Sequence, residues 1–375
     1  MSTWHERLTE TMKRHPGVAD AVITTEAESG RNLVAYFTPH PQRAASVARL
    51  LEWRTGNAMG EKLYTLPDGT IIAHLNKGET DFTFEEIFTD RCYLKHGVTV
   101  DEGDCVFDIG ANIGMFSLYL AMLPIAVDVF AFEPLPPLYR LLNINRDICG
   151  MHGVKTFPYG LSRTAAREIF TYYPRNSIMS GRYANVDEDG DVVRTYLTRQ
   201  VDVATAELPG ALDGVVNDAL VSERFECELR SVSDVIAEHG VQRIDLLKLD
   251  VEKSELDVLQ GIRDQDWPKI RQIVVEVYDG DDHLRIIEQL LRKHGFTVVT
   301  EQEDGLRDTR VYMLYATRVQ DKQTLVDRAE HQIEEGWRNS PTLLAADVRW
   351  YVERYLPDVK QLPEFVAVSA IPRRG

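Results

Sequence analysis

The sequence has few cysteines, no long apolar run and a deficit of positive charge, and each absence excludes a class of protein. Only four of its 375 residues are cysteines, scattered and without a Cys-x-x-Cys pair, so neither a disulfide framework nor a zinc site is expected. No segment approaches the about 18 apolar residues of a membrane helix. The net charge of −17 disfavours a nucleic-acid substrate, because phosphate backbones are also negative.

What is present is an ordinary globular composition, with 44% hydrophobic and 27% charged residues. The first residues, Met1–His15, are mixed and charged and lack the apolar core of a secretory signal. We therefore expect a cytoplasmic protein without a membrane partner. Its length fits one large domain with additions, or two domains.

From Cys105 onward, strand-like and helix-like segments alternate, which predicts a parallel sheet covered by helices on both faces. The expected strands are Cys105–Ile109, Val127–Phe132, Lys155–Tyr159, Leu246–Asp250 and Gln272–Val277. The expected helices are Phe116–Met122, Pro136–Cys149, Ser254–Ile262 and Asp282–His294.

Two further strand-like segments, Phe296–Glu301 and Val311–Thr317, flank Asp304-Gly305 and predict a terminal antiparallel hairpin. The expected fold is thus α/β, a doubly wound, mostly parallel sheet of seven strands that ends in this hairpin. Such an ending is unusual among nucleotide-binding folds, and it is the usual one of Rossmann-like, class I methyltransferases that use S-adenosylmethionine (SAM).

The remaining segments predict smaller additions to this sheet. Before residue 105, helices are expected at residues 5–15, Ala44–Thr55 and Thr80–Thr89. Two strands are expected at Ala19–Thr25 and Asn32–Thr38, joined by a turn at Glu26–Arg31. A hairpin is expected from Lys62–Leu66 and Thr70–Leu75. The long insertion Ser162–Asp234 contains two expected strands, Thr164–Tyr172 and Phe225–Leu229. Its acidic run Asp187–Asp191 is interpreted as a solvated loop. A long insertion in a compact domain is often a lid or a substrate wall.

The clearest motif is an apolar strand that runs into Asp108-x-Gly110-x-Asn112-x-Gly114 and then into a helix. Glycine allows a tight turn and close approach of a ligand to the backbone. Asn112 stands where a dinucleotide-binding loop has its second glycine, which a pyrophosphate requires. SAM has no phosphate, and an acidic residue with backbone polar groups suits its amino-acid tail.

Three carboxylates stand at or near the ends of other predicted strands. Glu133 ends the second strand about twenty residues beyond the glycine loop, where a carboxylate can accept both ribose hydroxyls. Asp250 ends the Leu246–Asp250 strand, and Glu276 lies near the end of the next one. Because ligands of open α/β sheets bind at the carboxyl ends of the strands, we expect Asp250 beside the cofactor, although it can also cap the following helix.

These segments together resemble the FkbM family of SAM-dependent methyltransferases. The similarity rests on Val106–Leu120, Ala131–Pro134, the signature-like stretch Lys248–Ile262 and Ile273–Tyr278. The upstream segment Tyr64–Gly97 is similar to the corresponding segment of family members that are embedded in natural-product synthases. The resemblance implies O-methylation. It also implies that Asp108, Gly110, Asn112 and Gly114 line the methionine part of SAM, that Glu133 with Pro134 holds the ribose, that Ser162 lies near the adenine, and that Asp250 faces the methyl group.

Transfer to an alcohol needs a base that takes the proton as the oxygen attacks. Asp250 is the first candidate and Glu276 the second, followed by Glu79 and His96. No cluster with a diagnostic ligand spacing is present, so no metal is expected.

The chain ends carry a second resemblance, to the two halves of the C-terminal subdomain of nonribosomal-peptide adenylation domains. It rests on His15–Val22 and Leu33–Tyr36 at one end and on Tyr355–Pro357 and Leu362–Pro372 at the other. The implied division is 1–45, an adenylation-like half; 46–320, the methyltransferase; and 321–375, a helical segment with the second half. Adenylation by this chain is not expected, because the Gly-Lys pair that carries the adenylating lysine is missing.

The predicted function is therefore SAM-dependent O-methylation of an amino-acid or acyl unit in nonribosomal-peptide biosynthesis. The resemblance at the chain ends implies a substrate tethered to the phosphopantetheine arm of a carrier protein, with neighbouring synthase domains as further partners. An acidic carrier would need a local basic face, for which Arg91 and Lys95 are candidates. Three alternatives stay open: N-methylation of an aminoacyl unit, a non-catalytic docking or scaffold module, and an NAD-dependent dehydrogenase. Asn112 and the terminal hairpin disfavour the dehydrogenase.

Overall fold

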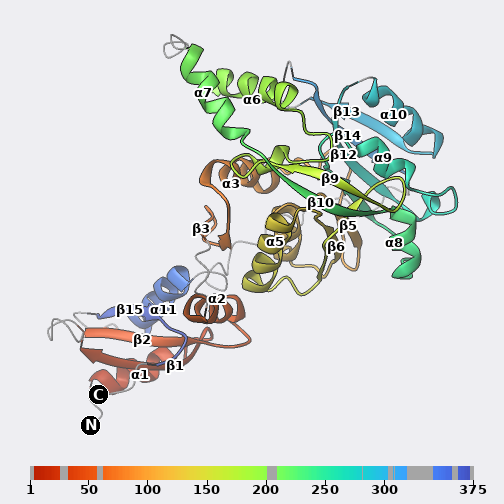
Figure 1. Ribbon diagram of the computed structural model, residues 1–375. Helices are drawn as coiled ribbons and strands as arrows, with labels where there is room; N and C mark the ends of the chain where they lie inside the picture. Colours follow the sequence, from red (N-terminus) through yellow and green to blue (C-terminus); the bar gives the residue numbers. More distant parts are fainter. Residues whose placement is uncertain are drawn as a thin grey trace. The chain divides into compact units, whose positions relative to one another are not determined.

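The structure, a computed structural model, groups the chain into two compact units (Figure 1). The first comprises Met1–His74, Ile144–Gly150 and Asp327–Gly375, and the second Leu75–Asn143 and Met151–Val326. Residues 4–25, 33–56, 62–200, 209–280, 282–302, 307, 309–318, 341–356 and 362–371 are described. The turns expected at Glu26–Arg31 and Asp304-Gly305 lie outside these residues.

The first unit joins the two ends of the chain in one small α/β fold. Its elements are α1 (Trp4–Lys13), β1 (Val18–Thr25), β2 (Leu33–Pro39), α2 (Ala45–Gly56), the hairpin of β3 (Leu63–Thr65) and β4 (Ile71–Ala73), α11 (Pro341–Tyr355) and β15 (Glu364–Ala367). Strand β15 pairs in parallel with β2, which pairs antiparallel with β1. Phe37 and Val348 belong to the same buried cluster, so residues from both ends share one core.

The predicted domain boundary after residue 45 differs from this grouping, in which residues 46–74 belong to the first unit. The reason is local packing. Leu50 of α2 forms a small core with Ile71 of β4 and Ile148, near the end of α5 (Pro136–Cys149). Asn145 of the same helix donates to and accepts from the backbone of Ala73.

The second unit is built on a seven-stranded sheet in the order β13-β14-β12-β11-β5-β6-β7. These strands are β5 (Cys105–Ile109), β6 (Asp128–Phe132), β7 (Val154–Phe157), β11 (Leu246–Leu249), β12 (Gln272–Tyr278), β13 (Thr297–Glu301) and β14 (Val311–Thr317). Five strands pair in parallel with their neighbours, and β14 is antiparallel to both β12 and β13, so β14 alone among the seven strands runs in the opposite direction. The predicted fold class and the terminal hairpin are confirmed.

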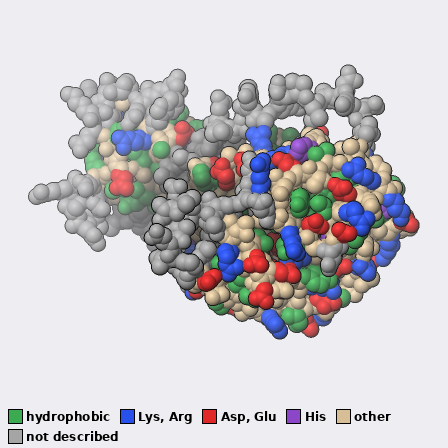
Figure 2. Space-filling view, turned by 90° about the horizontal axis from the view of Figure 1, so that it is seen from above, with side chains coloured by type: hydrophobic (Ala, Val, Ile, Leu, Met, Phe, Trp, Pro, Cys, Tyr) green, Lys and Arg blue, Asp and Glu red, His purple; other side chains and the backbone are tan. Residues whose placement is uncertain are grey.

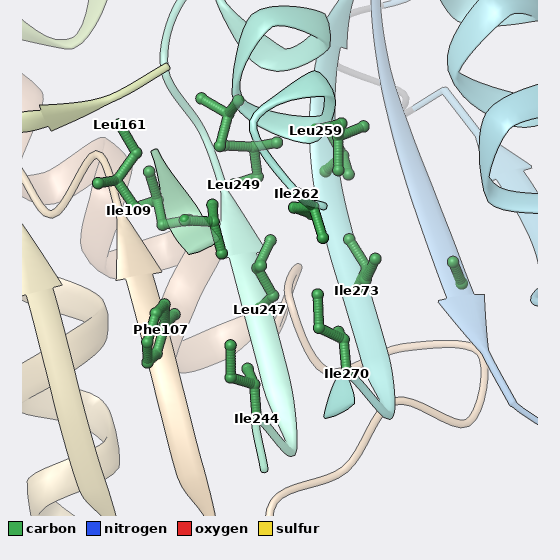
Figure 3. Close-up of a cluster of buried hydrophobic side chains, with 14 of the residues drawn as sticks. Phe107, Ile109, Leu161, Ile244, Leu247, Leu249, Leu259, Ile262, Ile270 and Ile273 are labelled. Atoms are coloured by element: carbon green, nitrogen blue, oxygen red, sulfur yellow. The ribbon is translucent and has the colours of Figure 1, made fainter. Parts of the chain in front are cut away.

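Alternate residues of the central strands form the core on one face of this sheet, as the two-residue period of a strand requires. Phe107 of β5, Leu247 of β11 and Ile273 of β12 lie side by side, and Leu259 belongs to the same cluster (Figure 3). The covering helices are α8 (Val232–Glu238), α9 (Glu255–Gln260) and α10 (His283–Lys293). This packing fixes the carboxyl ends of the strands, which carry the site.

The insertion forms a side sheet and a pair of helices. Strand β10 (Glu223–Arg230) lies between β8 (Gly160–Leu161) and β9 (Ala166–Tyr172), and α6 (Val186–Gln200) contacts α7 (Pro209–Ala219). The solvated loop expected at Asp187–Asp191 is wrong, because this run belongs to α6. Three acidic residues in the first turn favour a helix, since they face the positive end of its dipole.

The segment between the first unit and β5 begins with α3 (Lys77–Phe84), which Asn76 caps by accepting from the backbone N–H of Glu79, and continues as a π-helix, η1 (Glu85–Thr89). Among the described helices, none combines the length and the apolar character that crossing a membrane requires. On the face seen in Figure 2, basic and acidic side chains are interspersed.

Candidate functional site

A cavity of about 490 Å³ opens in the second unit at the carboxyl ends of β5, β6, β11 and β12. The strand order reverses between β5 and β11, and ligands of open α/β sheets bind at such a switch point. The insertion contributes Ser177 of η2 (Ser177–Met179), Val193 of α6 and Val215 of α7 to the lining. The site thus has a polar floor at the sheet and an apolar outer part.

The loop after β5 forms the first part of the floor. Gly110 and Asn112 have positive φ angles, of 79° and 50°. A β-carbon at Gly110 would lie 1.7 Å from the carbonyl oxygen of Asp250, so only glycine fits. Asn112 donates its backbone N–H to Glu133 Oε2 at 2.9 Å, and Gly110 lines the cavity beside it.

Glu133, at the end of β6, is buried and lines the same cavity. Its Oε1 accepts from the backbone N–H of Leu135 at 2.8 Å, which leaves lone pairs on both oxygens. Burial raises the pKa of Glu133 to about 7, although the two backbone N–H groups oppose the shift. Pro134 follows in the lining, and Ser162 lies in it with its Oγ accepting from Arg182 at 3.4 Å.

Two residues predicted to touch the cofactor are not part of the lining. Asp108 is fully buried behind the loop, where it accepts from Ser117 Oγ at 2.7 Å and lies 3.2 Å from the ammonium of Lys248. Lys248 in turn donates to the carbonyl oxygen of Gly110 at 2.8 Å. Gly114 has a φ of 92° and caps α4 (Met115–Met122) close to Leu142. Both residues shape the loop from behind.

Asp250 and Glu276, the first two candidates for the base, both line the cavity from neighbouring strand ends. Asp250 Oδ2 accepts from the hydroxyl of Tyr93 at 2.8 Å and lies 3.6 Å from Lys248 Nζ. Burial alone lowers the pKa of Lys248, but the carboxylates of Asp108 and Asp250 hold it above its usual value. Burial, followed by the charge of Asp250, raises the pKa of Glu276 well above its usual value.

Glu79 lines the cavity from α3, but both of its oxygens are engaged. Oε2 accepts from the backbone N–H of Ser177 at 3.0 Å and from its Oγ at 2.6 Å, and Oε1 accepts from Asn76. Burial raises the pKa of Glu79, and these hydrogen bonds oppose the shift. His96 is absent from the lining and pairs with Glu301 at 2.7 Å.

Sequence reasoning missed Glu252, Tyr93 and Lys248. Glu252 also lines the cavity, and one carboxylate oxygen of each of Asp250, Glu252 and Glu276 lies within 4.8 Å of the others. Burial and then Asp250 raise the pKa of Glu252 well above its usual value. The sequence pattern Lys248-x-Asp250-x-Glu252 could have indicated these residues, because the side chains of alternate residues in a strand point to the same face of the sheet.

The sheet order and the cofactor-type loop are those of class I SAM-dependent methyltransferases. The profile described as "Methyltransferase FkbM domain" matches residues 108–298. The chain is 42% identical over 259 residues to 31-O-demethyl-FK506 methyltransferase FkbM of Streptomyces tacrolimicus, an alignment of 68% of this chain and 95% of that protein. The chain therefore belongs to the FkbM methyltransferase family, and it is a SAM-dependent methyltransferase.

Other similarities extend further along the chain or into solved structures. AMB antimetabolite synthetase AmbE of Pseudomonas aeruginosa is 38% identical over 332 residues, which are 84% of this chain and only 15% of that synthetase. A crystal structure of methyltransferase FkbM from Methylobacillus flagellatus is similar with a TM-score of 0.37 at 16% identity, covering 59% of this chain and 45% of that one.

Proposed function

We propose that this chain transfers the methyl group of SAM to a hydroxyl oxygen of an amino-acid or acyl unit. The observation that carries the proposal is a single cavity lined by the Gly110–Asn112 loop, by Glu133 and by the carboxylates of Asp250 and Glu276. The name of the Streptomyces relative, a 31-O-demethyl-FK506 methyltransferase, supports oxygen as the acceptor.

The residues present fit SAM. Gly110 and Asn112 would hold the methionine part, Glu133 the ribose and Ser162 the adenine end, while Pro134 shapes the wall between them. When bound, SAM supplies a methyl group on a positively charged sulfur. A lone pair of the acceptor oxygen forms the O–CH₃ bond while the C–S bond breaks and its electron pair stays on sulfur. The hydroxyl proton passes to a carboxylate of the site, for which Asp250 is the first candidate and Glu276 the second.

Charge favours oxygen over nitrogen as the acceptor. An amine must lose its proton to expose a lone pair, and nearby carboxylates stabilise the protonated ammonium form. The pocket floor carries three such carboxylates, Asp250, Glu252 and Glu276. N-methylation therefore remains the second enzymatic candidate, and a non-catalytic docking module the third.

We also propose that the acceptor is tethered to a carrier protein. The alignment with the AmbE synthetase includes 84% of the chain, more than the family profile matches, which supports an origin among synthase domains. The apolar outer lining at Val193 and Val215 fits a phosphopantetheine arm, whose middle is uncharged. Arg91 is exposed and stays a candidate contact for an acidic carrier, together with Lys95.

The test has two stages. Calorimetry with SAM, and with NAD as the control ligand, establishes the cofactor. Purified protein is then offered matched hydroxy-acyl and aminoacyl units, each free and as a carrier thioester, and the products are fragmented by mass spectrometry. Methyl on oxygen of the thioester substrate supports the proposal, methyl on nitrogen replaces it by the second candidate, and folded protein that binds no SAM leaves only the docking module.

A further inference from the structure

Three carboxylates meet at the floor of the cavity without enough positive charge to balance them. Asp250 and Glu252 follow β11, and Glu276 stands near the end of β12. The two strands are paired in parallel, with Leu249 opposite Val275, and this register brings the three side chains together. One carboxylate oxygen of each lies within 4.8 Å of the other two.

Of the three, Asp250 alone has a partner among the described residues. The contacts of Tyr93 and Lys248 both go to its Oδ2, so Oδ1 makes no hydrogen bond with the described part of the chain. The side-chain carboxylates of Glu252 and Glu276 form no hydrogen bond or ion pair with any described residue. Lys253, the nearest further cation in sequence, is paired with Glu188 and Asp189 at 2.9 and 2.8 Å.

A second observation, independent of the acidic cluster, points to a ligand in the same cavity. Ser254 lines the same cavity, is only 7% exposed, and its Oγ has no hydrogen-bond partner. The next residue, Glu255, is 1% exposed, and its Oε2 is also without a partner. Buried polar atoms are rarely left unpaired, so a ligand bound in this cavity would give the Ser254 hydroxyl the partner that the protein does not supply.

We propose that Asp250, Glu252 and Glu276 bind one hard divalent cation of the Mg²⁺ class. The donors are all oxygens, which Mg²⁺, Mn²⁺ and Ca²⁺ prefer and which exclude a thiolate-selecting metal. Two ligands on opposite sides of Mg²⁺ lie about 4.2 Å apart, so three oxygens within 4.8 Å of one another span a suitable space. Mg²⁺ in proteins is usually coordinated by only a few protein side chains and by several water molecules.

This inference rests on the proposed function and makes it more specific. Asp250 would bind the cation through Oδ1 while Oδ2 stays with Tyr93 and Lys248. The acceptor hydroxyl would replace one water of the cation, which lowers the pKa of that hydroxyl and fixes its oxygen. The O–CH₃ bond then forms and the C–S bond breaks as described above. One step of the proposed function changes: because Asp250 holds the cation, the hydroxyl proton leaves to water in place of Asp250.

The expectation of no metal came from spacing along the chain, where Asp250 and Glu276 are far apart. A cation site assembled from two neighbouring strands leaves no compact ligand motif in the sequence. The substrate class follows from the same chemistry: an acceptor with a second oxygen next to the hydroxyl, such as an α- or β-hydroxyacyl unit, could chelate the ion.

The experiment is a titration of the full chain, treated with EDTA and exchanged into metal-free buffer, with Mn²⁺ monitored by electron paramagnetic resonance. We expect one site per chain, competition by Mg²⁺, and at least tenfold weaker binding in Glu276→Gln and in Glu252→Gln. Glu226→Gln, which removes an exposed carboxylate on β10 paired with Arg167, is the matched control and should bind like the wild type.

Two readings keep this test independent of folding and of the proposed function. Thermal unfolding with and without Mg²⁺ should show stabilisation of the wild type and of Glu226→Gln only. The absence of saturable Mn²⁺ binding by the wild type, or an equal loss in Glu226→Gln, would overturn the site. A titration with SAM in the presence of EDTA separates the two proposals. If the protein binds SAM but not Mn²⁺, the cation site alone is wrong. If it binds Mn²⁺ but not SAM, the methyltransferase assignment is wrong and the cation site stands.

Discussion

We expect Glu133 to make SAM binding depend on pH. Its raised pKa, about 7, means that the buried carboxyl is about half protonated at pH 7 in the free protein. The contribution of this group to folding stability is therefore complete below its unfolded pKa near 4.5 and is lost as the pH rises through about 7. In the proposed complex the ribose hydroxyls donate to the ionised form, so SAM affinity should increase about tenfold between about pH 6 and 8.

Calorimetry across that pH range measures this increase. Glu133→Gln keeps the shape but cannot ionise, so its residual SAM binding should be weak and flat with pH. The control Glu226→Gln should keep the wild-type profile. A wild-type affinity that does not change with pH would show that Glu133 is not the ribose partner.

Gly110 is the glycine of the site loop at which an added methyl group should lower the folding stability. The added carbon of Gly110→Ala would meet a backbone carbonyl at 1.7 Å, and the φ of 79° is unfavourable for alanine. We expect a loss of about 2–5 kcal/mol in the free energy of unfolding, measured by urea denaturation. Gly97→Ala is the control, because φ is 87° there but no atom lies within 4 Å, so about 1 kcal/mol is expected. Equal costs at the two positions would contradict the close approach to Asp250.

Asp189 ties helix α6 to the rest of the second unit. This buried carboxylate accepts from Tyr173 OH at 2.9 Å and from Lys253 Nζ at 2.8 Å. Asp189→Ala should cost about 1.5–3 kcal/mol of local stability, because hydrogen bonds to a charged group are lost. Hydrogen–deuterium exchange should then accelerate in α6 and α7 while the seven-stranded sheet is unchanged. Asp191→Ala, which removes a side chain that is 80% exposed, should leave the exchange of both helices as in the wild type.

The elements that the sequence predicted well are those whose pattern is local. The alternation of apolar strands and helices gave β5, β11, β12 and the terminal hairpin within about two residues of the observed bounds, because each is a buried run bounded by breakers. The loop predicted at the acidic start of α6 is wrong, since charge alone does not distinguish a solvated loop from the first turn of a helix in which one carboxylate, that of Asp189, is buried. Its docking depends on Tyr173 and Lys253, and such long-range partners are not visible in a local pattern.

In the candidate site, too, the residues of a local motif could be predicted from the sequence, and the contacts between distant segments could not. Gly110, Asn112 and Glu133 lie in the lining, as the loop and strand-end pattern predicted. Asp108 carries the same motif but lies behind it, because the alternation of β5 turns its side chain to Ser117 and Lys248. The grouping of Asp250 with Glu276 required the order of strands in the sheet, which pairs β11 with β12, so the shared floor could be described only from the structure.

The two units of the molecule should respond differently to the cofactor, because every residue that lines the cavity belongs to the second unit. Phe37→Ala removes a fully buried ring from the core of the first unit and should cost about 3–5 kcal/mol there. Differential scanning calorimetry should show one transition lowered by this change and another raised by SAM, with SAM affinity within about twofold of the wild type. Ile273→Ala, in the sheet core of the second unit, is the matched variant and should lower the SAM-sensitive transition instead. If Phe37→Ala lowered both transitions equally and weakened SAM binding, the two units would be a single cooperative domain, and the first unit would be required for the methyltransferase fold.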